Sequence, residues 1–384
     1  MQGISAMPAS TLDLRSEYQL PKVIPQIDRL RGLAILLVLV CHSQRVMPPV
    51  LSGIARQCWM GVDLFFVLSG FLITGILWET RSADHYFKRF YARRALRIWP
   101  VYLLCLFFVF CIVSVFKPLV AGIFGRIPKD PLGLWVYLLM IQNLFGDRLF
   151  LSQFLPVTWS LATEEQFYLL WPAVIRRASW RVLLPFLFAG LLLAPFLRLW
   201  AAHHGFSPIA IYYNPLTHCD ALLWGAIIAI WLRSIRERRG TLLAAGVVLI
   251  FAGAALFVPI YPYSVASQHC SPLVFTAVAL MSAGILLVAL VSENLGVYLH
   301  RFFFMNQTLS FFGLISYSLY LYHLPVLRFF ASDKLAAKIN WWHQPDLTER
   351  IMFLFGIVMS IVLAWISRVT VERAALSKKY LFDS

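Results

Sequence analysis

Long apolar runs alternate with short polar segments along almost the whole chain. About ten of these runs approach the roughly 20 apolar residues that a helix needs to cross a bilayer. The pattern therefore predicts an all-α membrane protein, a polytopic bundle of about ten transmembrane helices. The predicted spans are residues 32–50, 61–79, 98–116, 158–175, 182–199, 217–233, 241–260, 271–291, 309–330 and 350–371.

Basic residues lie mostly in the segments between these runs, and such an excess marks the cytoplasmic loops of membrane proteins. This rule places segments 81–97, 176–181 and 233–239 in the cytoplasm. The chain must then cross the membrane an even number of times between the first two segments, so 132–145 and 158–175 cannot both cross. We assign the crossing to 158–175 and expect 132–145 to be a re-entrant or interfacial element.

The same rule predicts a three-part chain with both termini in the cytoplasm. Residues 1–26 form an N-terminal segment, residues 27–373 the transmembrane domain and residues 374–384 a cytoplasmic tail. No apolar stretch followed by a cleavage site precedes the first span, so we expect that span itself to direct insertion.

The composition supports this interpretation and narrows the possible partners. Of the 384 residues, 60% are hydrophobic and 13% are charged, whereas a soluble domain carries about 25% charged residues. The net charge of +15 follows from the basic loops and needs no nucleic-acid partner; binding of an anionic ligand or of lipid headgroups at the cytoplasmic face is the alternative. The six cysteines include no CxxC pair, so we predict neither disulfides nor a metal site.

Ionisable residues inside apolar spans are energetically costly, so each is a candidate for function. Arg31 and His42 are 11 residues apart, which on a helix puts both side chains on one face, about 16 Å apart along the axis. We expect Arg31 at the cytoplasmic rim, where it suits a phosphate, and His42 deep in the membrane, where it suits proton transfer. A topogenic Arg31 and a His42 bonded to a neighbouring carbonyl group explain the pair equally well.

Two adjacent carboxylates, Glu164 and Glu165, lie inside the run 158–175, where a purely structural role is hard to justify. On a helix they point about 100° apart, so only one of them can face a common centre. Ser160 and Tyr168 share a stripe with Glu164 and are candidate substrate contacts.

Polar residues also lie toward the outer ends of other spans. Asp63 could orient His42 and raise its basicity, or could simply cap its helix at the interface. We expect His42, Asp63, both glutamates and His323 to be catalytic, and His218 and Asp220 to bind substrate. The candidates thus divide into two groups, an outer acid–base cluster of His42, Asp63, Glu164, Glu165, His218, Asp220 and His323 and a cytoplasmic basic rim of Arg31, Arg93, Arg94 and Arg97.

Five segments resemble motifs of the acyltransferase-3 family of bacterial multi-pass membrane acyltransferases. They are IDRLRGLAILLVLVCH from residue 27, GVDLFFVLSGFLIT from 61, FYARRALRIWPVYLL from 90, TWSLATEEQFYLLWP from 158 and ISYSLYLYHLP from 315. The resemblance runs in order from about residue 27 to 373. The chain departs from the family pattern at Val157, His218 and Ala374, where the family usually carries His, Arg and Pro.

The resemblance implies transfer of an acyl group, commonly acetyl, from cytoplasmic acyl-CoA to a hydroxyl group of a glycan. It implies no permanently bound cofactor, a location in the bacterial inner membrane, and a glycan or lipid-linked sugar as acceptor, with lipopolysaccharide O-antigen or exopolysaccharide expected first. Some members carry a fused extracytoplasmic hydrolase-like domain, which we do not expect here. Two alternatives are a small secondary metabolite such as a macrolide as acceptor and, from another class, a proton-coupled transporter.

The resulting hypothesis joins both groups of residues. The phosphates of acetyl-CoA or another acyl-CoA dock on the basic rim, with Arg31 foremost, and the thioester is presented near His42. His42 then acts as general base on the acceptor hydroxyl or takes the acyl group itself. Asp63 or one of the two glutamates orients His42.

Overall fold

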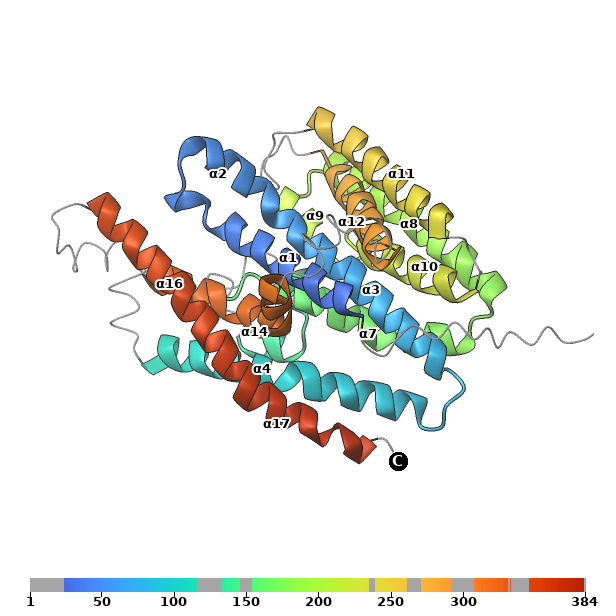
Figure 1. Ribbon diagram of the computed structural model, residues 1–384, viewed down its shortest axis with the longest axis horizontal. Coiled ribbons are helices and arrows are strands. Elements are labelled where there is room, and N and C mark those ends of the chain that lie inside the picture. The colour runs from blue at the N-terminus through green and yellow to red at the C-terminus, as the bar shows by residue number, and fades with distance from the viewer. Residues whose placement is uncertain are drawn as a thin grey trace, which may run out of the picture.

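The computed structural model describes residues 24–115, 133–145, 154–234, 239–260, 271–291, 307–330, 332 and 345–382. Within these ranges every regular element is a helix, which confirms the predicted all-α class (Figure 1). The long helices are α1 (Pro25–His42), α3 (Gly61–Thr80), α4 (Tyr86–Val115), α7 (Thr158–Arg177), α8 (Trp180–His203), α10 (Asp220–Ser234), α11 (Arg239–Phe257), α12 (Val274–Val291), α14 (Gln307–Phe330) and α16 (Pro345–Ser367).

Short elements connect or extend these helices. They are η1 (Gln44–Val46), α2 (Pro49–Ala55), η2 (Arg56–Met60), α6 (Trp135–Leu138), η3 (Gln142–Leu144), α9 (Pro208–Tyr213), η6 (Val258–Ile260), η9 (Arg368–Glu372), α17 (Arg373–Leu376) and η10 (Ser377–Phe382). The tail predicted from residue 374 is therefore helical as far as it is described.

Each predicted span overlaps one of the long helices. In the part of the chain that the structure describes, 7 helices are long and apolar enough to cross a membrane, and they contain α3, α4, α8, α11, α12, α14 and α16. The other three predicted spans fall on α1 and α7, which carry charged residues, and on α10, which is described over 15 residues. α1 and α7, the two helices set apart by their charged residues, hold Arg31, His42, Glu164 and Glu165.

Residues 133–145 form no spanning helix. They contain two short turns, α6 and η3, and Met140 lies between them with a φ of 53°. Gln142 donates to the carbonyl of Thr158, and Tyr102 of α4 donates to the carbonyl of Tyr137. Hydrogen bonds thus fasten the segment to α7 and α4, as expected of an element that does not cross the membrane.

The helices around α3 form the centre of the bundle, and others form its periphery. In the span that contains α3, 72% of an apolar stretch of 18 residues is buried, against 22% of the corresponding stretch in α8 and 17% in α11. Large apolar side chains such as Leu192 and Phe251 are exposed on these peripheral helices. Such a surface is suited to lipid rather than water.

α1 crosses α14 at a point where both helices carry glycine. A Cβ on Gly32 would overlap the carbonyl oxygen of Leu309, and one on Gly313 would overlap that of Asp28. Small residues allow this backbone approach in a membrane, where close packing drives helix association. The crossing fixes α1 against α14, the two helices that carry His42 and His323.

Candidate active site

A row of three cavities runs between α1, α3, α7 and α14. The first is lined by Arg31 of α1, Arg94 and Arg97 of α4, and Glu164 of α7. The second shares Arg31 and Glu164 with the first and extends to Tyr320 of α14. The two cavities therefore have a common wall, and the basic residues line one end of the row.

The third cavity continues the row to the far end of α1. It shares Val62 and Tyr320 with the second cavity and is also lined by His42. The empty volumes, which include space open to solvent, are about 470, 480 and 520 Å³ from the first to the third. Arg31 and His42 thus line opposite ends of one row, in agreement with their spacing on α1.

The three arginines of the first cavity have free donor capacity. No guanidinium group of Arg31, Arg94 or Arg97 makes a hydrogen bond or ion pair with another described residue; the Arg94 group instead lies 5.5 Å above the ring of Tyr168. Each guanidinium carries five N–H donors in a fork that matches phosphate. This end of the row can therefore hold a polyanion.

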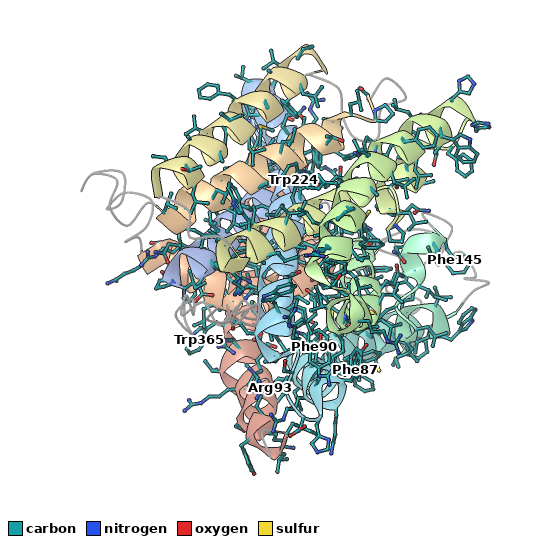
Figure 2. The ribbon with its side chains drawn as sticks, turned by 90° about the vertical axis from the view of Figure 1, so that its right-hand side faces the viewer. Phe87, Phe90, Arg93, Phe145, Trp224 and Trp365 are labelled. Atoms are coloured by element: carbon teal, nitrogen blue, oxygen red, sulfur yellow. The ribbon has the colours of Figure 1, made fainter. Side chains whose placement is uncertain are left out.

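The C-terminal end of the described chain adds another cation beside these arginines. α17 and η10 pack along α4, as Figure 1 shows, and Lys379 lies within electrostatic range of Arg93, Arg94 and Arg97. From sequence alone Lys379 is only a basic residue of the tail, because its proximity to α4 depends on the fold. Arg93, which is labelled in Figure 2, is an exposed residue of α4. It lines none of the three cavities.

Glu164 is held by two hydroxyl groups. Ser69 Oγ donates to its Oε1 at 2.7 Å, and the Tyr168 hydroxyl donates to its Oε2 at 3.0 Å. Glu164 lines the two cavities that Arg31 also lines, and not the cavity of His42. Its predicted place in the outer acid–base cluster is therefore wrong, because residue depth along a helix does not decide which neighbours the side chain meets.

Glu165 points elsewhere, as the angle between adjacent helix positions requires. It lines none of the three cavities, and its buried Oε1 has no hydrogen-bond partner among the described residues. The next residue, Gln166, donates to the carbonyl of Met140 and to Asn143 Oδ1, both at 2.9 Å. Gln166 and Asn143 fix the orientation of α7, a role that has no signal in the sequence beyond their polarity in an apolar region.

Ser160 and Tyr320 lie where the second cavity meets the third. Their hydroxyl oxygens are 2.6 Å apart, and the Tyr320 hydroxyl also donates to the carbonyl of Val157 at 3.1 Å. Ser160, a predicted substrate contact, therefore lines the row. The other predicted contact of this stripe, Tyr168, lines the first cavity and holds Glu164.

His42 and His323 form a pair at the far end of the row. His42 Nδ1 lies 2.9 Å from the carbonyl oxygen of Val38 and 3.3 Å from His323 Nε2, and the ring centroids are 5.0 Å apart. His323 Nδ1 lies 3.0 Å from the carbonyl oxygen of Leu319. Carbonyl oxygens only accept hydrogen bonds, so in the neutral rings both Nδ1 atoms carry the proton, an assignment inferred from the contacts. His323 Nε2 then accepts from His42, and His42 Nε2 keeps a free lone pair.

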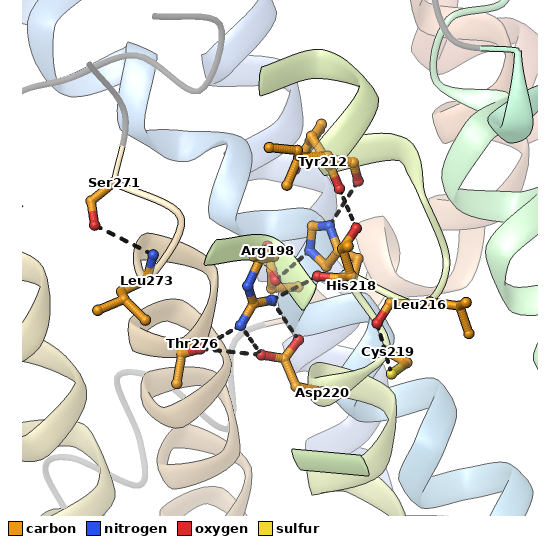
Figure 3. A network of polar contacts seen from close by, with 12 residues as sticks. Arg198, Tyr212, Leu216, His218, Cys219, Asp220, Ser271, Leu273 and Thr276 are labelled. Carbon is orange, nitrogen blue, oxygen red and sulfur yellow. Dashed lines mark hydrogen bonds and ion pairs between the residues drawn. The ribbon is translucent and has the colours of Figure 1, made fainter. Parts of the chain in front are cut away.

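Asp63 does not contact His42. Its Oδ1 lies 2.8 Å from His218 Nε2. His218 Nδ1 in turn lies 3.0 Å from the carbonyl oxygen of Tyr212, and Figure 3 labels both residues. The side chains of Asp63 and His218 are fully buried. The expectation that Asp63 or a glutamate orients His42 is therefore wrong. The carbonyl of Val38 and Nε2 of His323 instead contact His42 Nδ1 and orient the ring.

A second buried pair joins α8 to α10. Arg198 donates to both carboxylate oxygens of Asp220, at 3.2 and 2.7 Å, and also bonds Thr276 of α12 (Figure 3). Neither Asp220 nor His218 lines the cavity row, so the structure ties both to helix packing around the site. Arg198 was missed from the sequence, although an arginine within the predicted span 182–199 is itself a signal.

Aromatic rings form most of the wall of the third cavity. Trp159 stacks on Tyr213 with ring centroids 5.0 Å apart and planes 14° from parallel. The aromatic residues of this wall are Trp59, Trp159, Tyr212, Tyr213 and Tyr320. Flat apolar surfaces with a few polar groups are typical of sites that bind organic ligands.

Comparison with known proteins identifies the family. The model of the family described as "Acyltransferase domain" matches residues 24–369. The chain belongs to this acyltransferase family. Its relatives include the peptidoglycan O-acetyltransferase OatA of Listeria monocytogenes, which is 30% identical over 330 residues that cover 80% of this chain and 50% of the relative.

Two further relatives come from Staphylococcus aureus. The O-acetyltransferase OatA is 26% identical over 376 residues, covering 94% of this chain and 58% of the relative. A putative O-acetyltransferase is 26% identical over 331 residues, covering 82% of this chain and 52% of the relative. The chain thus spans about half the length of the curated relatives that it matches, and no solved structure matches it.

Proposed function

We propose that this acyltransferase moves an acyl group, in the first instance acetyl, from cytoplasmic acyl-CoA to a hydroxyl group of an exported or cell-surface glycan. The observation that carries the proposal is the row of cavities that joins Arg31, Arg94 and Arg97 to His42. Membership of the family and relatives that are named O-acetyltransferases support it. Family membership also argues against the transporter alternative.

The arginine end of the row suits the nucleotide end of the donor. Phosphate oxygens can accept several hydrogen bonds from guanidinium groups, and these three have no such bond to another described residue. The long pantetheine arm can then follow the cavities along α1 toward His42, about 16 Å away along the helix axis. In the proposed orientation the arginine end and both termini face the cytoplasm of a bacterial inner membrane.

The His42 end suits the chemical step. His42 Nε2 takes the proton of the acceptor hydroxyl while the hydroxyl oxygen attacks the thioester carbonyl carbon. The C–S bond breaks, and the departing CoA thiolate takes the proton back from the imidazolium. If Nε2 instead takes the acyl group before the hydroxyl does, the same geometry serves both steps.

His323 supports this step through Nδ1 of His42. When His42 is protonated, its Nδ1–H still donates to His323 Nε2 and to the Val38 carbonyl, and hydrogen bonds from charged donors are the stronger ones. His323 thus has the position that a carboxylate occupies in a catalytic triad. It is a positioning residue in this scheme.

Purified full-length chain in detergent, supplied with labelled acetyl-CoA and purified glycans, tests the function. We expect label in the glycan and one free CoA thiol for each acetyl group transferred. Mass spectrometry of the lipopolysaccharide, exopolysaccharide and peptidoglycan of a strain that lacks the chain then identifies the acceptor. Unchanged O-acetylation of all three would refute the glycan assignment and favour a small metabolite.

A further inference from the structure

Arg328 of α14 lies one helical turn beyond the wall of the His42 cavity. Tyr320 and Leu324 of α14 line that cavity, and Arg328 follows Leu324 by four residues, on the same face of the helix. Arg328 also lies within electrostatic range of His42, of His323 and of Tyr213, another lining residue. It therefore stands at the end of the row that is opposite to Arg31.

The guanidinium group of Arg328 has no counter-charge in the part of the chain that the structure describes. It makes no hydrogen bond or ion pair with a described residue, although it is half-buried. By contrast, Arg45, three residues after His42, pairs with Glu349 at 2.8 Å, and the fully buried Arg198 pairs with Asp220 at 2.7 Å. Arg328 is thus a partly desolvated cation with its donors available.

A partly buried charge is unfavourable unless an opposite charge accompanies it. The planar fork of a guanidinium group fits a carboxylate or a phosphate with two parallel hydrogen bonds. At the arginine end of the row this chemistry suits the donor, but Arg328 lies at the opposite end, beside the histidine pair and the aromatic wall. A ligand anion at Arg328 therefore belongs to the acceptor.

We propose that Arg328 binds an anionic group, a carboxylate or a phosphate, on the acceptor and so holds a neighbouring hydroxyl toward His42. The acceptor is then an acidic glycan, or a saccharide that still carries a phosphate, rather than a neutral one. This inference rests on the proposed function and adds the charge of the acceptor to it. Arg328 is a substrate-binding residue in this scheme.

Three oligosaccharides with one backbone separate the sources of the anion. They are a neutral glucose trisaccharide, its analogue with one glucuronic acid, and its 1-phosphate. In acetyl transfer we expect Arg328→Gln to raise the KM of an anionic acceptor about 10- to 100-fold, the value of a charge-assisted hydrogen bond, with the KM of acetyl-CoA unchanged. Arg328→Lys keeps the charge but loses the planar fork of the guanidinium group. Its KM for the anionic acceptor should lie between those of the wild type and Arg328→Gln. Arg45→Gln, which removes a paired arginine at the same end, is the matched control.

Binding without acetyl-CoA tests Arg328 separately from catalysis. Trp59 and Trp159 line the cavity, so their fluorescence can report binding of each trisaccharide to the full-length chain. If Arg328→Gln binds only the acidic trisaccharides more weakly, the proposal is supported even when acyl transfer fails. The acidic trisaccharide whose binding is weakened shows whether Arg328 prefers a carboxylate or a phosphate. The proposal is overturned if the wild type and Arg328→Gln bind each trisaccharide equally well. It is also overturned if Arg328→Gln loses as much affinity for the neutral trisaccharide as for the acidic ones.

Discussion

His323 offers the sharpest test of how the histidine pair works. Leucine at this position removes the acceptor atom that lies 3.3 Å from His42 Nδ1 and keeps an apolar side chain in a fully buried place. His42 Nδ1 still has the Val38 carbonyl at 2.9 Å, so the ring keeps its orientation and its free Nε2. We therefore expect His323→Leu to slow the reaction and not to abolish it.

The magnitude follows from the bond that is lost. A neutral hydrogen bond contributes about 0.5–1.5 kcal/mol, and one from a charged donor about 1.5–3 kcal/mol. Only the difference between them assists the step in which His42 becomes charged, and 3.3 Å lies at the long end of the hydrogen-bond range. A loss of about 1–1.5 kcal/mol corresponds to a roughly 5- to 10-fold lower kcat.

Steady-state transfer from labelled acetyl-CoA, with purified variants, measures this effect. We expect the KM values of both substrates to stay within about twofold, because His323 contacts His42 and not the row of cavities. His323→Gln is the matched variant, since its amide oxygen can accept the same bond and should restore most of kcat. Thermal unfolding of both variants controls for loss of packing.

Two results would refute this reasoning. A wild-type kcat for His323→Leu would mean that the contact with His42 has no part in the reaction. A loss of about 1,000-fold or more, as general-base removal can cause, would mean that His323 itself is the base or the acyl carrier.

Other predictions follow from the donor site and from the packing around the cavities. Arg31→Gln should weaken CoA binding about 10- to 100-fold, measured by calorimetry, since one charge-assisted bond to phosphate is lost; unchanged affinity would contradict the donor assignment. Arg198→Met leaves Asp220 buried and unpaired and should destabilise the protein by about 3–5 kcal/mol, seen in denaturant unfolding in detergent. Gly313→Ala should cost about 1–3 kcal/mol in the same measurement by forcing α1 from α14, whereas Gly53→Ala, with nothing within 4 Å of the added Cβ, should not destabilise.

The helices and the Arg31–His42 relation could be predicted from sequence because both depend on local rules. Bilayer thickness sets the length of an apolar run, and helix periodicity sets which residues share a face. The same local rule separates Glu164, which lines the row, from Glu165, which does not. These features need no knowledge of how the helices pack.

The partners of the polar residues could not be predicted because they depend on packing between distant segments. His42 meets His323 across 281 residues, and Asp63 meets His218 across 155. Depth in the membrane made Asp63 a plausible partner for His42, but the faces that α1, α3 and α14 turn toward each other decide the contact. Arg328 shows the same limit, since only its place beside the cavity distinguishes it from a basic residue at a helix end.

In the proposed reaction His42, at the end of the path from the arginine site, carries out the transfer. Single-turnover transfer by His42→Gln, with CoA binding measured on the same sample, tests this role. The control is His203→Gln, at the exposed C-terminal end of α8. For His42→Gln we expect wild-type CoA affinity and a transfer rate lower by about 100-fold or more, with no change in the control. Transfer at the wild-type rate by His42→Gln would contradict it.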